Sequence, residues 1–306
     1  MQGVIEKQEF FTSARQEQLL TQLRQRYPFV YARTLTRTAF GRSVAALQLG
    51  GGPRKVLITA GHHANEAITS ALLWRLLFAY CQALRTGGTL GGIPARTLFS
   101  GSMLYLVPLV NPDGADLAAG GCGPDTAEYR AAAQIAAGYP DVPFPLGWKA
   151  NLRGVDLNLN YPARWDLARC IKKERGVDGP APRDFAGFSP LDQPETAALA
   201  AFTSCIHPDL MLALHAQGEV IYPGPEESAP DGAAELGAAF AAASGYALEP
   251  VPPESANAGF KDWFLQRFRR PAFTIEVGSG ENPLPPAQLD EIYARTLGIF
   301  TAALTW

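Results

Sequence analysis

The stretch Thr59-Ala60-Gly61-His62-His63-Ala64-Asn65-Glu66 follows the apolar run Lys55-Val56-Leu57-Ile58 and precedes a helical pattern that begins near Ala67. It therefore lies where a buried strand ends and a helix begins, and in α/β sheets this edge is where ligands bind. Because His63 and Glu66 stand three residues apart, one turn projects both side chains to the same side, where they can hold one metal ion. The pattern also fits a helix start with an acidic residue and an incidental histidine, so the rest of the chain must decide.

Two other predicted strands end in residues of the same chemical kind. The apolar run 210–214 is followed by His215, and the apolar run 272–275 leads into Glu276. A single histidine at a strand end is more often structural, but two of them together with Glu66 make a metal site competitive. A carboxylate at the end of an apolar strand is costly unless a polar group faces it, so Glu276 is expected to join the same converging set.

The order of the patterns predicts a single α/β domain over residues 1–306. Runs of β-forming residues predict a hairpin at 31–49 and core strands at 55–60, 103–110, 210–214 and 272–275. Helical spacing predicts helices at 9–26, 70–84, 190–206, 229–244, 260–269 and 286–304. No repeat or linker divides the chain, so we expect a mixed, mainly parallel sheet with helices on both faces and an N-terminal helical segment, 1–30, packed on it.

Two segments lack a regular pattern. Residues 86–94 are rich in glycine and read as a loop. Residues 115–190 show no strong periodicity, while glycine and proline recur, and a long irregular region inside a compact domain is usually functional. Its part from Trp148 to Pro162 is too polar for a core and too regular for a flexible linker.

The composition restricts the classes of partner. With 26 basic and 29 acidic residues and no run of like charges, the chain gives no electrostatic reason to expect nucleic acid or an anionic membrane, and small or peptidic substrates are favoured. Arg75 interrupts the most apolar predicted helix, so we expect no membrane span. Residues 1–7 show no secretory signal and the four cysteines are scattered, which makes the cytoplasm the expected compartment. The oligomeric state stays open.

The converging residues suggest a hydrolytic metal site. His63, Glu66 and His215 supply two imidazoles and one carboxylate, which is the ligand set of a catalytic zinc ion with one position left for water. Zinc lowers the pKa of such a water to about 7, and a nearby free carboxylate can then take its proton. Glu276 is the expected general base, and one Zn²⁺ per chain is the expected cofactor.

Amide hydrolysis also needs a cation or donor that stabilises the developing oxyanion. The irregular region offers two candidates, Lys149 and Arg153. Arg153 is preferred here because its guanidinium is a forked and permanently charged donor, although Lys149 remains an alternative.

Four blocks of the chain together carry a family resemblance. The blocks are Gly61-His62-His63-Ala64-Asn65-Glu66, Asn111-Pro112-Asp113-Gly114, Gly154-Val155-Asp156-Leu157-Asn158-Leu159-Asn160, and Leu214-His215 together with Phe273-Thr274-Ile275-Glu276. In their order and spacing they resemble the zinc metallocarboxypeptidases. By that resemblance His63, Glu66 and His215 bind one zinc ion, Glu276 is the general base, Arg153 polarises the carbonyl and Asn158 contacts the substrate. The implied fold is a mixed sheet of about eight strands with helices on both faces.

Two departures from that family narrow the expected substrate. Carboxypeptidases carry an arginine after the motif asparagine, where this chain has Leu159, and no obvious match to their substrate-capping tyrosine precedes Gly259. Together with His215-Ala216-Gln217-Gly218-Glu219, Pro182-Arg183-Asp184-Phe185-Ala186-Gly187 and Asn282-Pro283-Leu284-Pro285, the departures resemble the bacterial γ-D-glutamyl-diamino acid peptidases. That resemblance implies hydrolysis of the bond between D-glutamate and diaminopimelate in released cell-wall muropeptides. The expected substrate-binding residues are Asn158, Leu159, Lys149, Gln217 and Lys261.

Three other functions compete with this one. A general metallocarboxypeptidase and an N-acyl amino acid deacylase use the same zinc ligands, but both act on substrates with a free carboxylate, for which Leu159 offers no second arginine. A zinc-free peptide-binding protein would keep the fold alone. Retention of the three ligands and of Glu276 argues against that reading.

Overall fold

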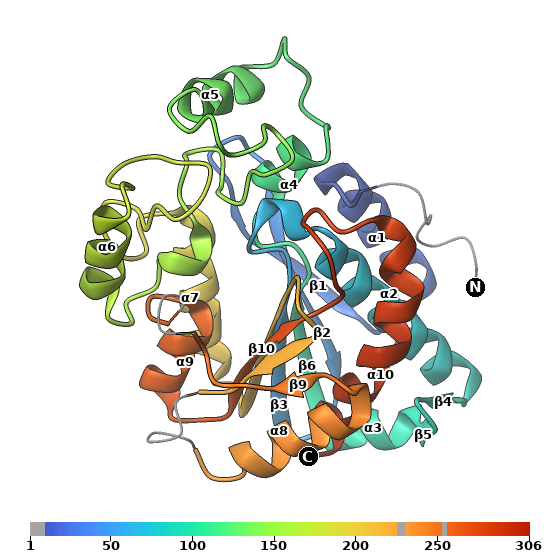
Figure 1. The fold of residues 1–306 in the computed structure, drawn as a ribbon. Coiled ribbons are helices and arrows are strands. Elements are labelled where there is room, and N and C mark those ends of the chain that lie inside the picture. The colour runs from blue at the N-terminus through green and yellow to red at the C-terminus, as the bar shows by residue number, and fades with distance from the viewer. Residues whose placement is uncertain (1–9, 225–229, 253–255) are drawn as a thin grey trace.

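An eight-stranded mixed sheet forms the centre of the protein in this computed structural model, which describes residues 10–224, 230–252 and 256–306 (Figure 1). The strand order is β1-β2-β6-β3-β7-β10-β8-β9. The four strands in the middle, β6, β3, β7 and β10, are mutually parallel, whereas β1, β2 and β8 pair antiparallel to their inner neighbours. The bounds are β1 Tyr31–Arg37, β2 Ser43–Gly50, β3 Arg54–Thr59, β6 Ser102–Val107, β7 Leu210–His215, β8 Val220–Tyr222, β9 Ala247–Leu248 and β10 Ala272–Glu276.

The sequence of the central strands explains why they lie in the middle. Every residue of β7 is buried, and the last four residues of β3 are buried as well. Strands covered on both faces read as continuous apolar runs rather than as alternating ones. Along β3, Val56 and Ile58 belong to the core on one face of the sheet and Leu57 to the core on the other.

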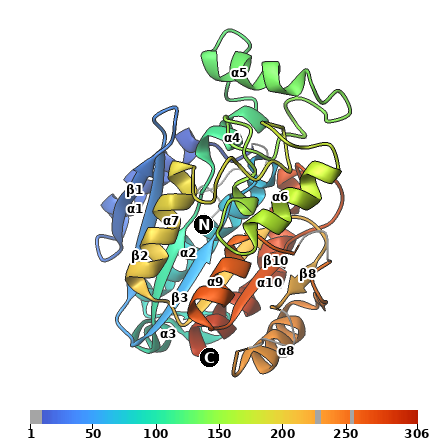
Figure 2. The ribbon, with the colours of Figure 1, turned by 90° about the vertical axis from the view of Figure 1, so that its left-hand side faces the viewer.

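Helices cover both faces of the sheet, as the sequence predicts. One face carries α2 (Ile68–Thr86), α8 (Ala233–Ser244) and α10 (Leu289–Thr305), whose apolar side chains pack with Val56 and Ile58. The other carries α7 (Pro194–Ile206) and α9 (Phe260–Phe268), which lie in front of the sheet in Figure 2.

The N-terminal helix α1 (Ser13–Arg26) buries Leu19, Leu20 and Leu23 in the core that α2 shares. It begins four residues later than predicted. Residues 1–7, in which no secretory signal was expected, and the predicted helix starts at 9 and 229 lie outside the described residues.

The helical stretch Ala64–Thr86 is long and apolar enough to cross a membrane, although Arg75 led us to expect no such stretch. However, 78% of its most apolar window is buried inside the protein, as in the core helix of a folded domain.

Short elements occupy the segments expected to be irregular and two neighbouring stretches, 95–101 and 112–114. They are β4 (Thr89–Leu90), β5 (Ile93–Pro94), α3 (Ala95–Gly101), α4 (Pro112–Ala118), α5 (Ala127–Ala136), the 3₁₀ turn η2 (Leu157–Leu159) and α6 (Trp165–Glu174). The helices α5 and α6 bury little: α5 buries only Ala132 and Ala136, and α6 only Trp165 and Ala168. Every residue of the short helix α4 is buried. A capping residue defines the start of α5, since the Thr126 side chain accepts a hydrogen bond from the Tyr129 amide. Such caps are local signals that the apolar pattern does not show.

Candidate metal centre

A tight turn after β3 carries the first two candidate ligands. Gly61 has a φ of +65°, and a Cβ placed there would lie 2.6 Å from the Ser70 hydroxyl oxygen, so a side chain would not fit. The Asn111 amide group holds the turn from the other side, donating to the carbonyl oxygens of His62 and Ala150 at 3.2 and 3.0 Å. The chain then enters the 3₁₀ turn η1 (Ala64–Glu66), which directs Glu66 to the same side as His63.

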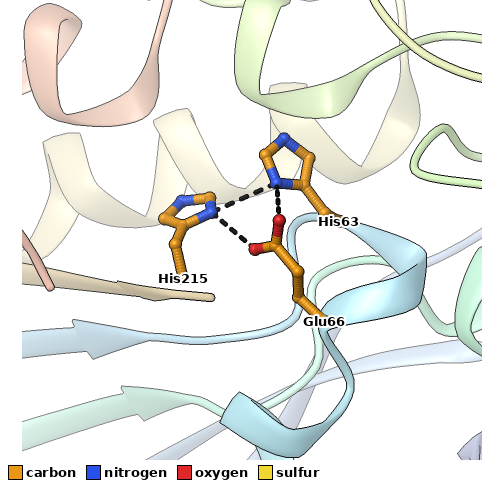
Figure 3. Close-up of side chains that lie close together, drawn as sticks. All are labelled: His63, Glu66 and His215. Atoms are coloured by element: carbon orange, nitrogen blue, oxygen red, sulfur yellow. Dashed lines mark hydrogen bonds and ion pairs between the residues drawn. The ribbon is translucent and has the colours of Figure 1, made fainter. Parts of the chain in front are cut away.

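His63, Glu66 and His215 converge at the carboxyl edge of the sheet, with their ligand atoms all within 4.8 Å of one another. Glu66 reaches His63 Nδ1 with Oε1 at 2.8 Å and His215 Nδ1 with Oε2 at 3.0 Å, and the two Nδ1 atoms are 3.2 Å apart. Figure 3 shows the three side chains pointing toward one another from η1 and the end of β7. All three are buried.

This donor set fits a zinc ion. Two imidazole nitrogens and a carboxylate that face one another in a buried place form a donor set for a shared cation, and two histidines with one glutamate are ligands that zinc uses in catalytic sites. Burial lowers the pKa of His215 and so favours the neutral, metal-binding imidazole. Burial acts in the same direction on His63, but the Glu66 carboxylate outweighs it and raises the pKa of His63 to about 9. The pocket therefore attracts positive charge.

A second carboxylate orients one of the imidazoles. His63 Nε2 lies 3.1 Å from Asp156 Oδ1, so the nitrogen that does not face Glu66 has its own partner. A carboxylate behind a histidine ligand fixes the ring and its tautomer. The sequence interpretation quoted Asp156 within a motif but gave it no role. Its place before Asn158 in the Gly154–Asn160 block was the available signal.

Lys149, rather than Arg153, is the cation that the structure brings to the three residues. Lys149 Nζ is 3.2 Å from Glu66 Oε1, and its side chain is only 19% exposed. Arg153 is the one exposed residue of the turn 151–155, in which its backbone amide and that of Val155 both donate to the Asn151 side-chain oxygen. Arg153 does not line the cavity at the metal centre. The preference for Arg153 rested on guanidinium chemistry, and the local turn places that side chain elsewhere.

Glu276 stands beside the centre at the end of β10. It pairs with His215 in the parallel register of β7 and β10 and lines the same cavity. Burial, reinforced by the negative charge of Glu66, raises the pKa of Glu276 to about 8. A carboxyl group with a pKa near the working pH is suited to accept and return a proton.

An open cavity of about 1010 Å³ surrounds these groups. Of the residues predicted to bind substrate, Asn158, Lys149, Gln217 and Lys261 line it. Leu159 does not, because it packs in a small apolar cluster with Trp165, Ala168, Ala186 and Ala258. The cavity also contains residues to which the sequence interpretation gave no role, among them Asn65, Arg183, Tyr222, Asp262 and Asn282.

Comparison with known proteins agrees with this geometry. The zinc carboxypeptidase family matches residues 16–297. The γ-D-glutamyl-L-diamino acid endopeptidase 1 of Lysinibacillus sphaericus is 39% identical over 285 residues, which are 93% of this chain and 70% of that protein.

Two solved structures are similar in fold. The carboxypeptidase A of Helicoverpa armigera has a TM-score of 0.68 at 17% identity, over 98% of this chain and 75% of its own. The murein-tripeptide amidase MpaA of Escherichia coli O157 has a TM-score of 0.52 at 24% identity, over 90% of this chain and 92% of its own. With the sequence match over most of the chain and the two-histidine, one-glutamate centre, the chain belongs to the zinc carboxypeptidase family and is a zinc metallopeptidase.

Proposed function

We propose that this enzyme hydrolyses the bond between the γ-carboxyl group of D-glutamate and a diamino acid, diaminopimelate, in cell-wall muropeptides. The observation that carries the substrate class is the 39% identity, over 93% of the chain, to a protein named for γ-D-glutamyl-L-diamino acid cleavage. The cavity supports it, because position 159 is an apolar residue packed away from the substrate. That position therefore provides no cation for the terminal carboxylate of an ordinary C-terminal residue.

The three metal ligands, Glu276 and Lys149 each have a task in this reaction. When bound by His63, Glu66 and His215, zinc supplies a Lewis acid for the scissile carbonyl and for water. Glu276 accepts the proton of the attacking water and passes it to the leaving amine. Lys149 donates to the oxygen on which negative charge develops, the role that the sequence first suggested for Arg153.

Two neighbouring charged residues of the cavity lining, Lys261 and Asp262, suit the zwitterionic end of the diamino acid. Lys261 Nζ lies 3.4 Å from Asp262 Oδ1 and donates to the Pro223 carbonyl oxygen at 3.0 Å. An ammonium and a carboxylate side by side complement a ligand that carries the same two charges in reverse. Asn158 and Gln217 line the same cavity and add neutral hydrogen-bonding groups.

We also propose a cytoplasmic compartment and released muropeptides as substrates. The four cysteines are unpaired, and Cys81 and Cys122 are buried as free thiols, which is typical of proteins from reducing compartments. Fractionation of cells that produce the tagged full-length protein tests this, and recovery in the culture medium would contradict it.

Digestion of defined peptides followed by mass spectrometry tests the reaction. We expect cleavage of L-Ala-γ-D-Glu-diaminopimelate and of its D-Ala-extended form, with α-linked C-terminal peptides and N-acetyl amino acids as poor substrates. If the enzyme releases C-terminal residues from α-linked peptides faster than it cleaves the γ-linked peptides, it is a general carboxypeptidase. Faster removal of acetyl groups would make it a deacylase.

A further inference from the structure

Arg183 is a cation of the cavity for which neither the metal centre nor the proposed proton transfers has a use. It lines the cavity together with Lys149, His63 and Glu276. Its side chain is 50% exposed, so substrate can reach it. The carbonyl oxygen of Pro182, the residue before Arg183, accepts a hydrogen bond from the Lys149 backbone amide at 2.8 Å, so the two cations enter the cavity from adjacent segments.

The backbone around Arg183 is fixed to the residues that hold the metal centre. The Pro182 carbonyl oxygen accepts hydrogen bonds from the amides of Lys149 and Ala150 at 2.8 and 2.9 Å. On the other side, the Asp184 amide donates to Asp156 Oδ2 at 3.3 Å, the same carboxylate that orients His63. Arg183 thus projects from a segment that is anchored on both sides, as a residue that reads substrate geometry requires.

The charge of Arg183 is not cancelled by its neighbours. Its Nε donates to Asp184 Oδ2 at 2.9 Å, but Lys172 binds the other oxygen of that carboxylate at 2.5 Å. The group of three therefore carries a net positive charge. Among the described residues, no hydrogen bond is found for the two terminal amino groups of Arg183, which are the groups that bind a carboxylate in the forked, two-bond geometry.

A D-glutamate that is linked through its γ-carboxyl group keeps a free α-carboxylate beside the scissile bond, whereas an α-linked residue has used that group in the bond itself. Three methylene or methine carbons separate this free α-carboxylate from the scissile γ-carbonyl, a span of about 5 Å. A substrate whose carbonyl oxygen meets Lys149 therefore carries its α-carboxylate a short distance further, within the part of the cavity that Lys149 shares with Arg183. From this arrangement we infer that Arg183 binds the free α-carboxylate of the γ-linked D-glutamate and so selects the γ-linkage, an assignment that rests on the proposed function.

The test compares two substrates and three forms of the zinc-loaded enzyme. The substrates are L-Ala-γ-D-Glu-diaminopimelate and the same peptide with the α-carboxylate of D-glutamate converted to an amide. We expect the wild type to cleave the peptide with the free α-carboxylate with a kcat/KM about 10- to 100-fold higher than that for the amide, mainly through a lower KM. A difference of this size corresponds to the loss of one charge-assisted hydrogen bond. In Arg183→Gln this preference falls to about twofold or less, because the carboxylate form slows and the amide form does not.

Two further measurements separate recognition from a general loss of structure. Arg175→Gln, an exposed arginine at the end of α6 that does not line the cavity, is the matched control and keeps the wild-type preference. The Glu276→Gln variant does not turn the peptides over, so calorimetry on it gives the affinity for each intact peptide. We expect this variant to bind the carboxylate peptide more tightly than the amide peptide, and to lose that difference only when Arg183 is also replaced.

The outcomes distinguish this inference from the proposed function. If the wild type cleaves neither γ-linked peptide, the proposed function fails and the assignment of Arg183 fails with it. If the wild type prefers the carboxylate and Arg183→Gln keeps that preference, the proposed function stands and the inference alone is overturned. A loss of equal size on both substrates, with the zinc content unchanged, also overturns it, since Arg183 would then act on a group common to both.

Discussion

The metal ligands and the substrate-facing cations lie at the same cavity but are held in different ways. His215 and Glu276 stand at the ends of adjacent parallel strands, and His63 and Glu66 follow a third, so the register of the sheet fixes them. Lys149 and Arg183 come from segments without regular structure, which bind each other through the Lys149 amide and the Pro182 carbonyl oxygen. The sheet thus places the reacting centre, while the irregular region supplies the groups that receive the substrate.

The strongest test of the sheet-borne half is removal of a ligand. His215→Ala leaves one imidazole and one carboxylate, so we expect zinc content to fall from about one ion per chain to near zero. Substitution of a residue that only hydrogen-bonds to a metal ligand lowers activity about 10- to 100-fold, and loss of the ligand itself should lower it further. Elemental analysis of the purified protein and kcat/KM measure both. Full activity in metal-free protein would contradict the zinc mechanism.

The next largest effect is expected at Glu276, and it separates proton transfer from metal binding among the residues held by the sheet. Glu276→Gln fills the same space but cannot accept a proton, so turnover is expected to fall by about 10²- to 10⁴-fold while zinc stays bound. Rates and metal content measured on the same sample decide this. A loss below tenfold in a folded, zinc-loaded variant would transfer the role to another group.

The comparison is sharpened by a pair of substitutions in the irregular half. Lys149→Gln is expected to lower kcat by about 10²- to 10³-fold, as for the loss of one oxyanion donor. Arg153→Gln, at an exposed side chain that does not line the cavity, should change kcat less than about threefold. Steady-state kinetics of both variants give the answer. The reverse ranking would restore the interpretation made from sequence alone.

A smaller effect concerns the pH dependence of stability. Glu195, in the first turn of α7, is buried, and this burial raises its pKa to about 7. The folded protein therefore binds the proton more tightly than the unfolded chain does, and stability is lost as pH rises from about 4.5 to about 7.

Glu195→Gln cannot ionise, so it is expected to match the wild type below about pH 4.5 and to exceed its stability by about 3 kcal/mol above about pH 8. Denaturant unfolding of both proteins across this pH range measures the difference. A pH-independent difference would show that Glu195 does not titrate in this window.

The difference between the sheet and the irregular region also explains which features could be predicted from the sequence. Continuous apolar runs locate strands, and the residue after each run is then placed by parallel pairing, which is why His63, His215 and Glu276 were correctly expected at one edge. The same periodicities predict the helices on both faces and six of the eight strands, β8 and β9 being the two they miss, whereas the total of about eight strands came from the family resemblance.

The irregular region was harder to predict for a physical reason. Its course depends on single hydrogen bonds, such as those that the Asn151 side chain accepts from the Arg153 and Val155 amides, and no periodicity records them. Hence Arg153 was preferred over Lys149, and Leu159 was expected to face the substrate although it packs beside Trp165. The role of Arg183 could be inferred only once its neighbours in space were known.

Asp156 joins the two halves of the site. One of its carboxylate oxygens meets the His63 imidazole, and the other accepts the backbone amide that follows Arg183. Binding events that share a connecting group are thermodynamically linked, and such linkage is reciprocal. Zinc affinity and muropeptide affinity are therefore expected not to be tuned independently in this enzyme, and a substitution that shifts residues 182–185 should alter both.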